Sequence, residues 1–287
     1  MGEELNFERE TNLEKKLRKN KLLIPFVTYS LALLFLAGIY GCILLFNLGH
    51  YWAIVPSGLL THSFLILCLH DASHKSITRS NFDRIFLNFC AGLVILPFYG
   101  EHYRKYHLTH HANTNKELDP ICPPITRKLY ENTRWLYVLC EFIPLVYTFY
   151  SVVNYHKNRD KAEEQRKPKT IKINHYYVIL AVCVSIVMLI LVKPPIWFLV
   201  LNLVVLNIVS VFRNWCEHIG TSENKESNTY WFPLGMGIGN HETHHHHANF
   251  SWLTLSIGLL YRKKDTNPFK SFLGILFNKS FRYYRDF

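Results

Sequence analysis

The chain has 287 residues, of which 49% are hydrophobic and 15% aromatic, and its formal net charge is +11 at pH 7. This apolar fraction is high for a soluble enzyme of such charge, so the composition excludes an ordinary soluble enzyme and predicts that the apolar residues are concentrated in membrane segments. In a membrane protein, the excess of basic residues indicates contact with anionic lipid headgroups rather than with nucleic acid.

The first 21 residues are polar and precede a long apolar run. That run is too long for the hydrophobic part of a signal peptide, so we expect no cleavable segment here.

Four long runs carry no Asp, Glu, Lys or Arg, and each approaches the roughly 20 apolar residues that cross a bilayer as a helix. They cover residues 22–48, 51–69, 176–192 and 196–212. Because only a few residues separate the first two runs and the last two, the pattern predicts an all-α membrane protein with four transmembrane helices in two hairpins. The hairpin tips fall at residues 47–50 and 193–195, and residues 1–287 are expected to form a single domain.

The basic residues predict the orientation of these spans. Lys193 is the only Lys or Arg within the two hairpins, and Lys and Arg near the ends of spans stay on the cytoplasmic side. Both tips are therefore expected to face away from the cytoplasm. The termini, the charged linker at 156–174 and a helical cap formed by residues 70–134 and 213–260 are expected to face the cytoplasm.

Two other apolar stretches are read as interfacial rather than spanning. The run Trp135–Tyr155 is close to spanning length, and a crossing there would separate the two halves of the cap, but Glu141 and Pro144 interrupt it. The run Ile85–Tyr99 is too short to span. Near the C-terminal end, Phe269–Phe281 is expected to form a surface helix.

Histidines recur at helical spacing in the predicted cap. Residues at i, i+3 and i+4 share one helix face, so such clusters direct several imidazoles to a common point, and neutral imidazole is a common ligand of iron, zinc and copper. The pair Asn214 and His218 has the same four-residue spacing after the fourth run. The predicted metal ligands are nine histidines and one asparagine: His70, His74, His107, His110, His111, Asn214, His218, His241, His244 and His245.

Nine histidines are too many for one ion, because an octahedral metal takes about six ligands, so the sequence predicts two metals that share the set. A set dominated by neutral imidazoles disfavours calcium and magnesium and suits oxidising chemistry, so we expect two iron ions (Fe²⁺/Fe³⁺) rather than zinc or copper. Ligating imidazoles usually donate their second N–H to an acceptor. Candidate acceptors are Asp71, Asp119, Glu217 and Glu242, although each alone is more often a solvated or capping residue.

These motifs resemble those of the membrane fatty acid desaturase superfamily. The stretches His70-Asp-Ala-Ser-His74 and His107-Leu-Thr-His110-His111, followed by Glu117-Leu-Asp119-Pro120, are similar to that family's first two histidine boxes, and Asn240-His241-Glu-Thr-His244-His245 is similar to the third. Asn214 and His218 resemble the additional ligand pair of acyl-coenzyme A desaturases. The chain departs from the family pattern at His246-His247-Ala248, where a proline often follows the third box.

The resemblance implies a four-helix membrane anchor with a cytosolic cap that holds two irons. It also implies that O2 is reduced there and that hydrogen is removed from a fatty acyl or lipid chain drawn from the membrane lipids. No fused cytochrome b5 motif is present in the sequence, so we expect the electrons to come from a separate ferredoxin- or cytochrome-b5-like donor.

Two alternative functions are considered beside a di-iron, O2-dependent fatty acyl desaturase. A lipid or carotenoid hydroxylase or ketolase of the same superfamily uses similar boxes, and the fold does not decide between the outcomes. A metal transporter or metal sensor also carries histidine-rich loops. Transporters, however, place ionisable ligands near the bilayer midplane. Here the spans carry no acidic residue and only His62 lies deep within one, so we expect an enzyme.

Overall fold

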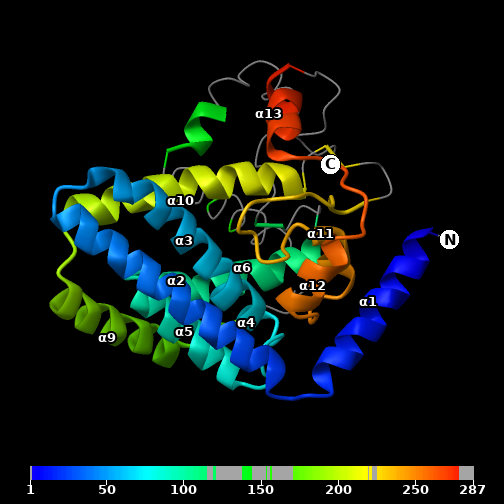
Figure 1. Cartoon of the computed structure of the whole chain (residues 1–287), viewed down its shortest axis with the longest axis horizontal. Helices are drawn as coiled ribbons and strands as arrows, with labels where there is room; N and C mark the ends of the chain where they lie inside the picture. Colours follow the sequence, from blue (N-terminus) through cyan, green and yellow to red (C-terminus); the bar gives the residue numbers. More distant parts are fainter. Residues whose placement is uncertain are drawn as a thin grey trace.

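The structure is a computed structural model, and it describes residues 2–114, 119–120, 138–143, 153, 156, 171–218, 220–221 and 225–277. Apart from two isolated β-bridges, the regular structure of these residues is helical, as the sequence predicts (Figure 1). The helices are α1 (Gly2–Arg18), α2 (Leu23–Asn47), η1 (Tyr51–Ala53), α3 (Ile54–Leu65), η2 (Ile66–His70), α4 (Asp71–Ser73), α5 (Phe82–Leu93), α6 (Tyr99–Asn113), α9 (His175–Val192), α10 (Ile196–Glu217), α11 (His241–His246), α12 (Trp252–Leu259) and α13 (Pro268–Phe277).

Four helical stretches are long and apolar enough to cross a membrane, and they coincide with the four runs predicted from the sequence. Their bounds are Leu23–Asn47, Tyr51–Ser73, His175–Val192 and Ile196–Glu217. Many of their large apolar side chains remain exposed in the isolated chain, among them Leu33, Leu34, Ile190 and Leu201. Such a surface is stable in a bilayer, because an apolar helix pairs its own backbone groups and exposes little polar area to the lipid.

Two of the four helices extend beyond the apolar runs. The second continues through a single π-helical turn, η2, into α4, and the fourth continues to Glu217. These extensions carry His70 and the residues that lead to His218 out of the apolar zone without a break in the helical backbone, so the spans position part of the histidine set directly.

The helices pack in an order that differs from the chain order. Helix α3 lies between α2 and α10, whereas α9 packs against α5 (Figure 1). The close approach of α5 to α9 requires Gly92, where a Cβ would lie 2.6 Å from the Cβ of Val184 and 2.8 Å from the carbonyl oxygen of Ala181. The core where α2, η2 and α5 meet is apolar, with Phe35, Leu67 and Leu87 buried.

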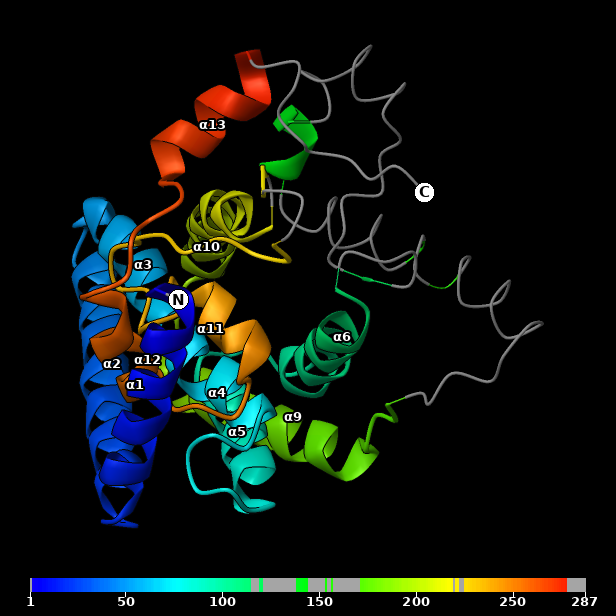
Figure 2. The ribbon, with the colours of Figure 1, turned by 90° about the vertical axis from the view of Figure 1, so that its right-hand side faces the viewer.

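The remaining elements surround one end of this bundle. Helix α1 packs against α12, and α13 packs against the end of α10 on another side of the molecule (Figure 2). Helix α13 confirms the predicted C-terminal helix over the residues that the structure describes. The predicted interfacial run 135–155 and the linker 156–174 lie largely outside the described residues. The described part of the former, 138–143, packs on α10, where Trp215 Nε1 donates to Glu141 Oε2 at 2.5 Å.

Candidate metal centre

Four separate helical segments deliver the histidines to one place. His70 ends the π-helical turn η2 and His74 follows α4, so both rings leave the end of the second predicted span. Helix α6 carries His107, His110 and His111. His218 directly follows α10, and the six-residue helix α11 carries His241, His244 and His245.

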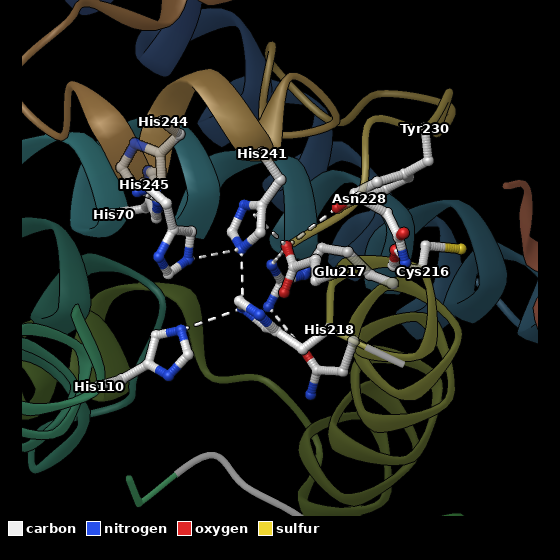
Figure 3. A network of polar contacts seen from close by, with 12 residues as sticks. His70, His110, Cys216, Glu217, His218, Asn228, Tyr230, His241, His244 and His245 are labelled. Atoms are coloured by element: carbon white, nitrogen blue, oxygen red, sulfur yellow. Dashed lines mark hydrogen bonds and ion pairs between the residues drawn. The ribbon is translucent and has the colours of Figure 1, made fainter. Parts of the chain in front are cut away.

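Eight of these histidines form two groups that could each hold a metal ion. Within each group, one ring nitrogen from every histidine lies within 4.8 Å of the others. Site A consists of His70, His74, His107 and His244, and site B consists of His110, His218, His241 and His245. Figure 3 shows site B, with the rings of His110 and His241 directed at His218.

The spacing of the nitrogens fits metal coordination. In site A, the Nε2 atoms of His70 and His244 lie 2.9 Å apart, and those of His74 and His107 lie 2.8 Å apart. In site B, the Nε2 atoms of His110 and His241 each lie 3.0 Å from that of His218. Nitrogens about 2.0–2.1 Å from an ion, at angles between tetrahedral and octahedral, lie about 2.9–3.4 Å from one another. Both sites therefore have the dimensions of imidazole-bound metal sites.

His111 lies between the two groups. Its Nε2 is 3.0 Å from that of His244 in site A, while its ring stacks on His245 of site B with centroids 4.3 Å apart. The ninth predicted histidine is thus at the junction of the sites.

Asn214 lies in the last turn of α10, four residues before His218. Its Oδ1 accepts a hydrogen bond from Nη2 of Arg213 at 2.8 Å, and Arg213 also pairs with Glu217 one turn further along α10. The sequence spacing placed Asn214 on the same helical face as His218, but it could not reveal that the neighbouring guanidinium holds the amide.

Hydrogen bonds donated by Nδ1 orient several of the rings. Asp71 Oδ1 accepts from Nδ1 of His70 at 3.1 Å, and Asp119 Oδ1 accepts from Nδ1 of His110 at 2.8 Å. The Nδ1 of His218 donates to the carbonyl oxygen of Glu226 at 3.0 Å. A proton held on Nδ1 leaves the Nε2 lone pair free for a metal, which is the usual arrangement around imidazole ligands.

The four carboxylates predicted to accept from the ligand histidines differ in the partners that they contact. Asp71 and Asp119 take the roles that the sequence predicts. Glu217 lies 3.7 Å from Nδ1 of His241, which has no hydrogen-bond partner among the described residues. Glu242 instead faces Lys225 and Arg262. The Glu226 carbonyl was not predicted, because a backbone acceptor leaves no signal in the sequence.

Burial keeps the rings neutral. The pKa values of His74, His107, His241 and His244 lie well below the usual value for histidine, because burial disfavours the charged imidazolium and the neighbouring imidazoles add repulsion. Unprotonated imidazole is the form that binds metals, so this environment prepares the nitrogens as ligands.

The other histidines near the clusters serve elsewhere. The rings of His246 and His247 contact Phe7, with centroids 5.1 and 5.9 Å apart, on the side of α11 that faces α1. The Nδ1 of His102 donates to the carbonyl oxygen of Phe98 at 2.7 Å. Both findings agree with the spacing, which places these residues off the ligand face.

These features define a helical protein with four helices able to cross a membrane and with two adjacent sites made of histidine. A family model described as fatty acid desaturase matches residues 29–257, and the chain belongs to that family. A segment of 114 residues is 30% identical to an sn-1 oleoyl-lipid 12-desaturase of Picosynechococcus sp.. This match covers 38% of the present chain and only 32% of the relative. Family membership makes the protein an oxidoreductase of lipid metabolism.

Proposed function

We propose that the protein is a membrane-bound, O2-dependent fatty acyl desaturase with one iron ion in site A and one in site B. The observation that carries this proposal is the pair of adjacent four-histidine groups, each with ring nitrogens within 4.8 Å of one another. Membership of the desaturase family supports a lipid substrate and O2, and the 12-desaturase relative acts on an oleoyl lipid.

The eight grouped histidines hold the two ions in this proposal, and His111 completes the set at the junction of the sites. Asn214 stays a proposed ligand, since its amide oxygen has a second lone pair beside the one that accepts from Arg213. When bound, the iron pair supplies the oxidising power needed to remove hydrogen from an unactivated C–H bond with O2 as oxidant. The donor set fits iron because neutral imidazoles suit it and disfavour calcium or magnesium.

The protein residues contribute position and exclusion of water. Tyr103 stacks on His107 with ring centroids 5.1 Å apart, and it covers one face of that ring. Because His70 and His244 in site A and His110 and His241 in site B are almost fully buried, these ligands are shielded from bulk solvent. Such shielding protects a strongly oxidising centre from side reactions with water.

We further propose that the four spans form two hairpins, in a single domain, with the histidine cap and both termini on the cytoplasmic side. Figure 1 supports this arrangement, since the connections α2–α3 and α9–α10 lie at one end of the molecule and α11 and α12 lie at the other. The concentration of Lys and Arg outside the hairpins supports the orientation. A ferredoxin- or cytochrome-b5-like donor would then supply electrons from the cytoplasm.

Metal analysis and lipid profiling test this proposal. Purified protein is expected to contain about two irons per chain, and stoichiometric zinc without iron would overturn the di-iron centre. Lipids of a host that provides a compatible electron donor are expected to lose two hydrogens when the protein is expressed. A gain of one oxygen instead would assign the protein to the hydroxylases or ketolases.

A further inference from the structure

Helix α1 carries a buried carboxylate that does not belong to either metal site. Helix α1 is mostly polar, yet the side chain of Glu10 is completely buried. Glu8 in the same helix is exposed. Burial of a carboxylate is costly unless hydrogen bonds or opposite charges compensate it, so the groups around Glu10 identify what holds it there.

Both carboxylate oxygens of Glu10 are fully engaged. Oε1 accepts from Asn240 Nδ2 at 2.8 Å and from Arg262 Nε at 3.0 Å. Oε2 accepts from Thr243 Oγ1 at 2.9 Å and from Arg262 Nη2 at 2.9 Å. Arg262 thus binds the carboxylate in a bidentate manner, and the two remaining donors come from the segment that carries the third histidine cluster.

Asn240 and Thr243 alternate with histidines of both sites. Helix α11 has six residues, and it is too short to be stable without tertiary contacts. Its ligand histidines, His241, His244 and His245, face the metal sites, while Asn240 and Thr243 face Glu10. Helix α11 is therefore held between the predicted metals on one face and a buried ion pair on the other.

The packing around Glu10 leaves little room for movement. A Cβ on Gly258 of α12 would lie 2.7 Å from Asn240 Nδ2 and would also collide with Oε1 of Glu10. One helical turn further along α1, Glu14 Oε2 accepts from Ser251 Oγ at 2.8 Å and from Thr254 Oγ1 at 2.6 Å. Helix α1 is therefore fixed at two points to the segment that follows the third cluster.

We infer that Glu10 is a positioning residue for the metal centre, which sets the orientation of α11 and thereby the places of His241 in site B and His244 in site A. This inference rests on the proposed metal-binding function. Glu10 touches neither the ligand nitrogens nor a substrate, and it acts through Asn240 and Thr243. Helix α1, which lies outside the histidine motifs, thus helps to position the proposed metal ligands.

The test compares Glu10→Gln with Glu8→Gln by titration of the metal-free full-length protein with Co²⁺, followed by absorption spectroscopy. Glu10→Gln keeps the size of the side chain but removes the carboxylate that Arg262 binds in a bidentate manner. We expect Co²⁺ affinity to fall about 10-fold, the lower end of the range for loss of a group bonded directly to a ligand, because Glu10 acts through Asn240 and Thr243. The exposed Glu8→Gln is expected to bind Co²⁺ as the wild type does.

Thr243→Val provides a second, milder variant, because it removes one hydrogen bond to Glu10 and keeps the ion pair with Arg262. It is expected to weaken Co²⁺ binding and to alter the ligand-field bands, even if Glu10→Gln fails to fold. Wild-type Co²⁺ affinity and spectra in Thr243→Val, or in a folded Glu10→Gln, would overturn the inference. Failure of the wild type to bind two ions would instead overturn the proposed function.

Discussion

The Nε2 atoms of His110 and His218 lie 3.0 Å apart although 108 residues separate them in the sequence. One ring comes from α6 and the other from the end of a helix able to cross the membrane. Each is oriented from behind, by Asp119 and by the Glu226 carbonyl respectively. Site B thus depends on contacts between distant segments that fix the rings through their Nδ1 atoms.

Replacement of His218 by Ala is expected to remove a ligand from site B while site A keeps all four histidines. The protein should then retain about one metal per chain and lose at least about 100-fold in product formation, since a lost ligand costs more than a lost outer partner. His102→Ala is the matched control, because His102 lies outside both sites. Retention of two irons and full turnover in His218→Ala would remove His218 from the ligand set.

Replacement of Asp119 by Ala should weaken site B more mildly. The carboxylate accepts from His110 Nδ1 at 2.8 Å, so its loss frees the ring to rotate and lowers the basicity of Nε2. We expect about a 10- to 100-fold loss in affinity for one of the two ions, measured by competition with a chelator. Asp119→Asn should fall between Ala and wild type, because the amide oxygen still accepts the hydrogen bond. Equal loss at both sites would contradict this assignment.

The ion pair between Arg84 and Glu101 predicts a pH-dependent contribution to stability. Burial raises the pKa of Glu101, but hydrogen bonds from Arg84 and from the Asn174 backbone outweigh it and hold the pKa below the ordinary value of 4.5. A group with a depressed folded-state pKa stabilises the fold above its unfolded pKa, and this contribution is lost as the pH falls below about 4.5 through the folded pKa.

Glu101→Gln is therefore expected to lower the free energy of unfolding by about 1–3 kcal/mol at neutral pH, the cost of weakening a buried charged hydrogen-bond network. The difference from wild type should shrink as the pH is lowered below 4.5. Thermal unfolding of both proteins in detergent at pH 7 and pH 4 measures it. A stability difference that grows toward pH 4 would contradict the predicted direction of the pH dependence.

The approach of α3 to α10 predicts a strong effect of a small substitution. A Cβ on Gly58 would lie 2.5 Å from the Cβ of Val205, so Gly58→Ala must separate two helices that end near site A and site B. Overpacking of this kind costs about 1–3 kcal/mol. Gly41→Ala on α2 is the control, since an added Cβ there meets nothing within 4 Å. Thermal unfolding should show Gly58→Ala to be less stable than Gly41→Ala. Equal stability of the two variants would show that α3 and α10 separate at little cost.

The sequence predicted the spans well, but it did not predict how the histidines divide between two sites, for a physical reason. Uncharged runs of spanning length have few other stable environments, so the observed bounds differ from the predicted ones mainly where helices continue beyond the apolar zone. The histidine clusters, in contrast, do not act as units. His244 belongs to site A, whereas His241 and His245 of the same short helix belong to site B.

That division depends on the relative placement of α6, α10 and α11, which spacing along one helix does not contain. The role of Glu10 is hidden for the same reason. A glutamate in a polar N-terminal segment usually faces solvent, and only the tertiary position of α1 beside Arg262 makes burial possible. The hydrogen bond from Arg213 to the amide oxygen of Asn214 is a further contact that the spacing does not contain.

The proposed membrane orientation predicts which side of a vesicle each turn faces. The exposed residues His50 and Lys193 lie in the two connections between spans, and Lys263 lies in the cap region after α12. Single cysteines at these three positions, in a chain whose native cysteines are replaced, are expected to divide by side when treated with a membrane-impermeant thiol reagent. His50→Cys and Lys193→Cys should react from one side, because two spans separate them in the proposed topology. Lys263→Cys should react from the other side, because one further span separates it from Lys193. Reaction of His50→Cys and Lys193→Cys from opposite sides would require another crossing between them, and sites A and B could not then both be assembled from segments on a single membrane face.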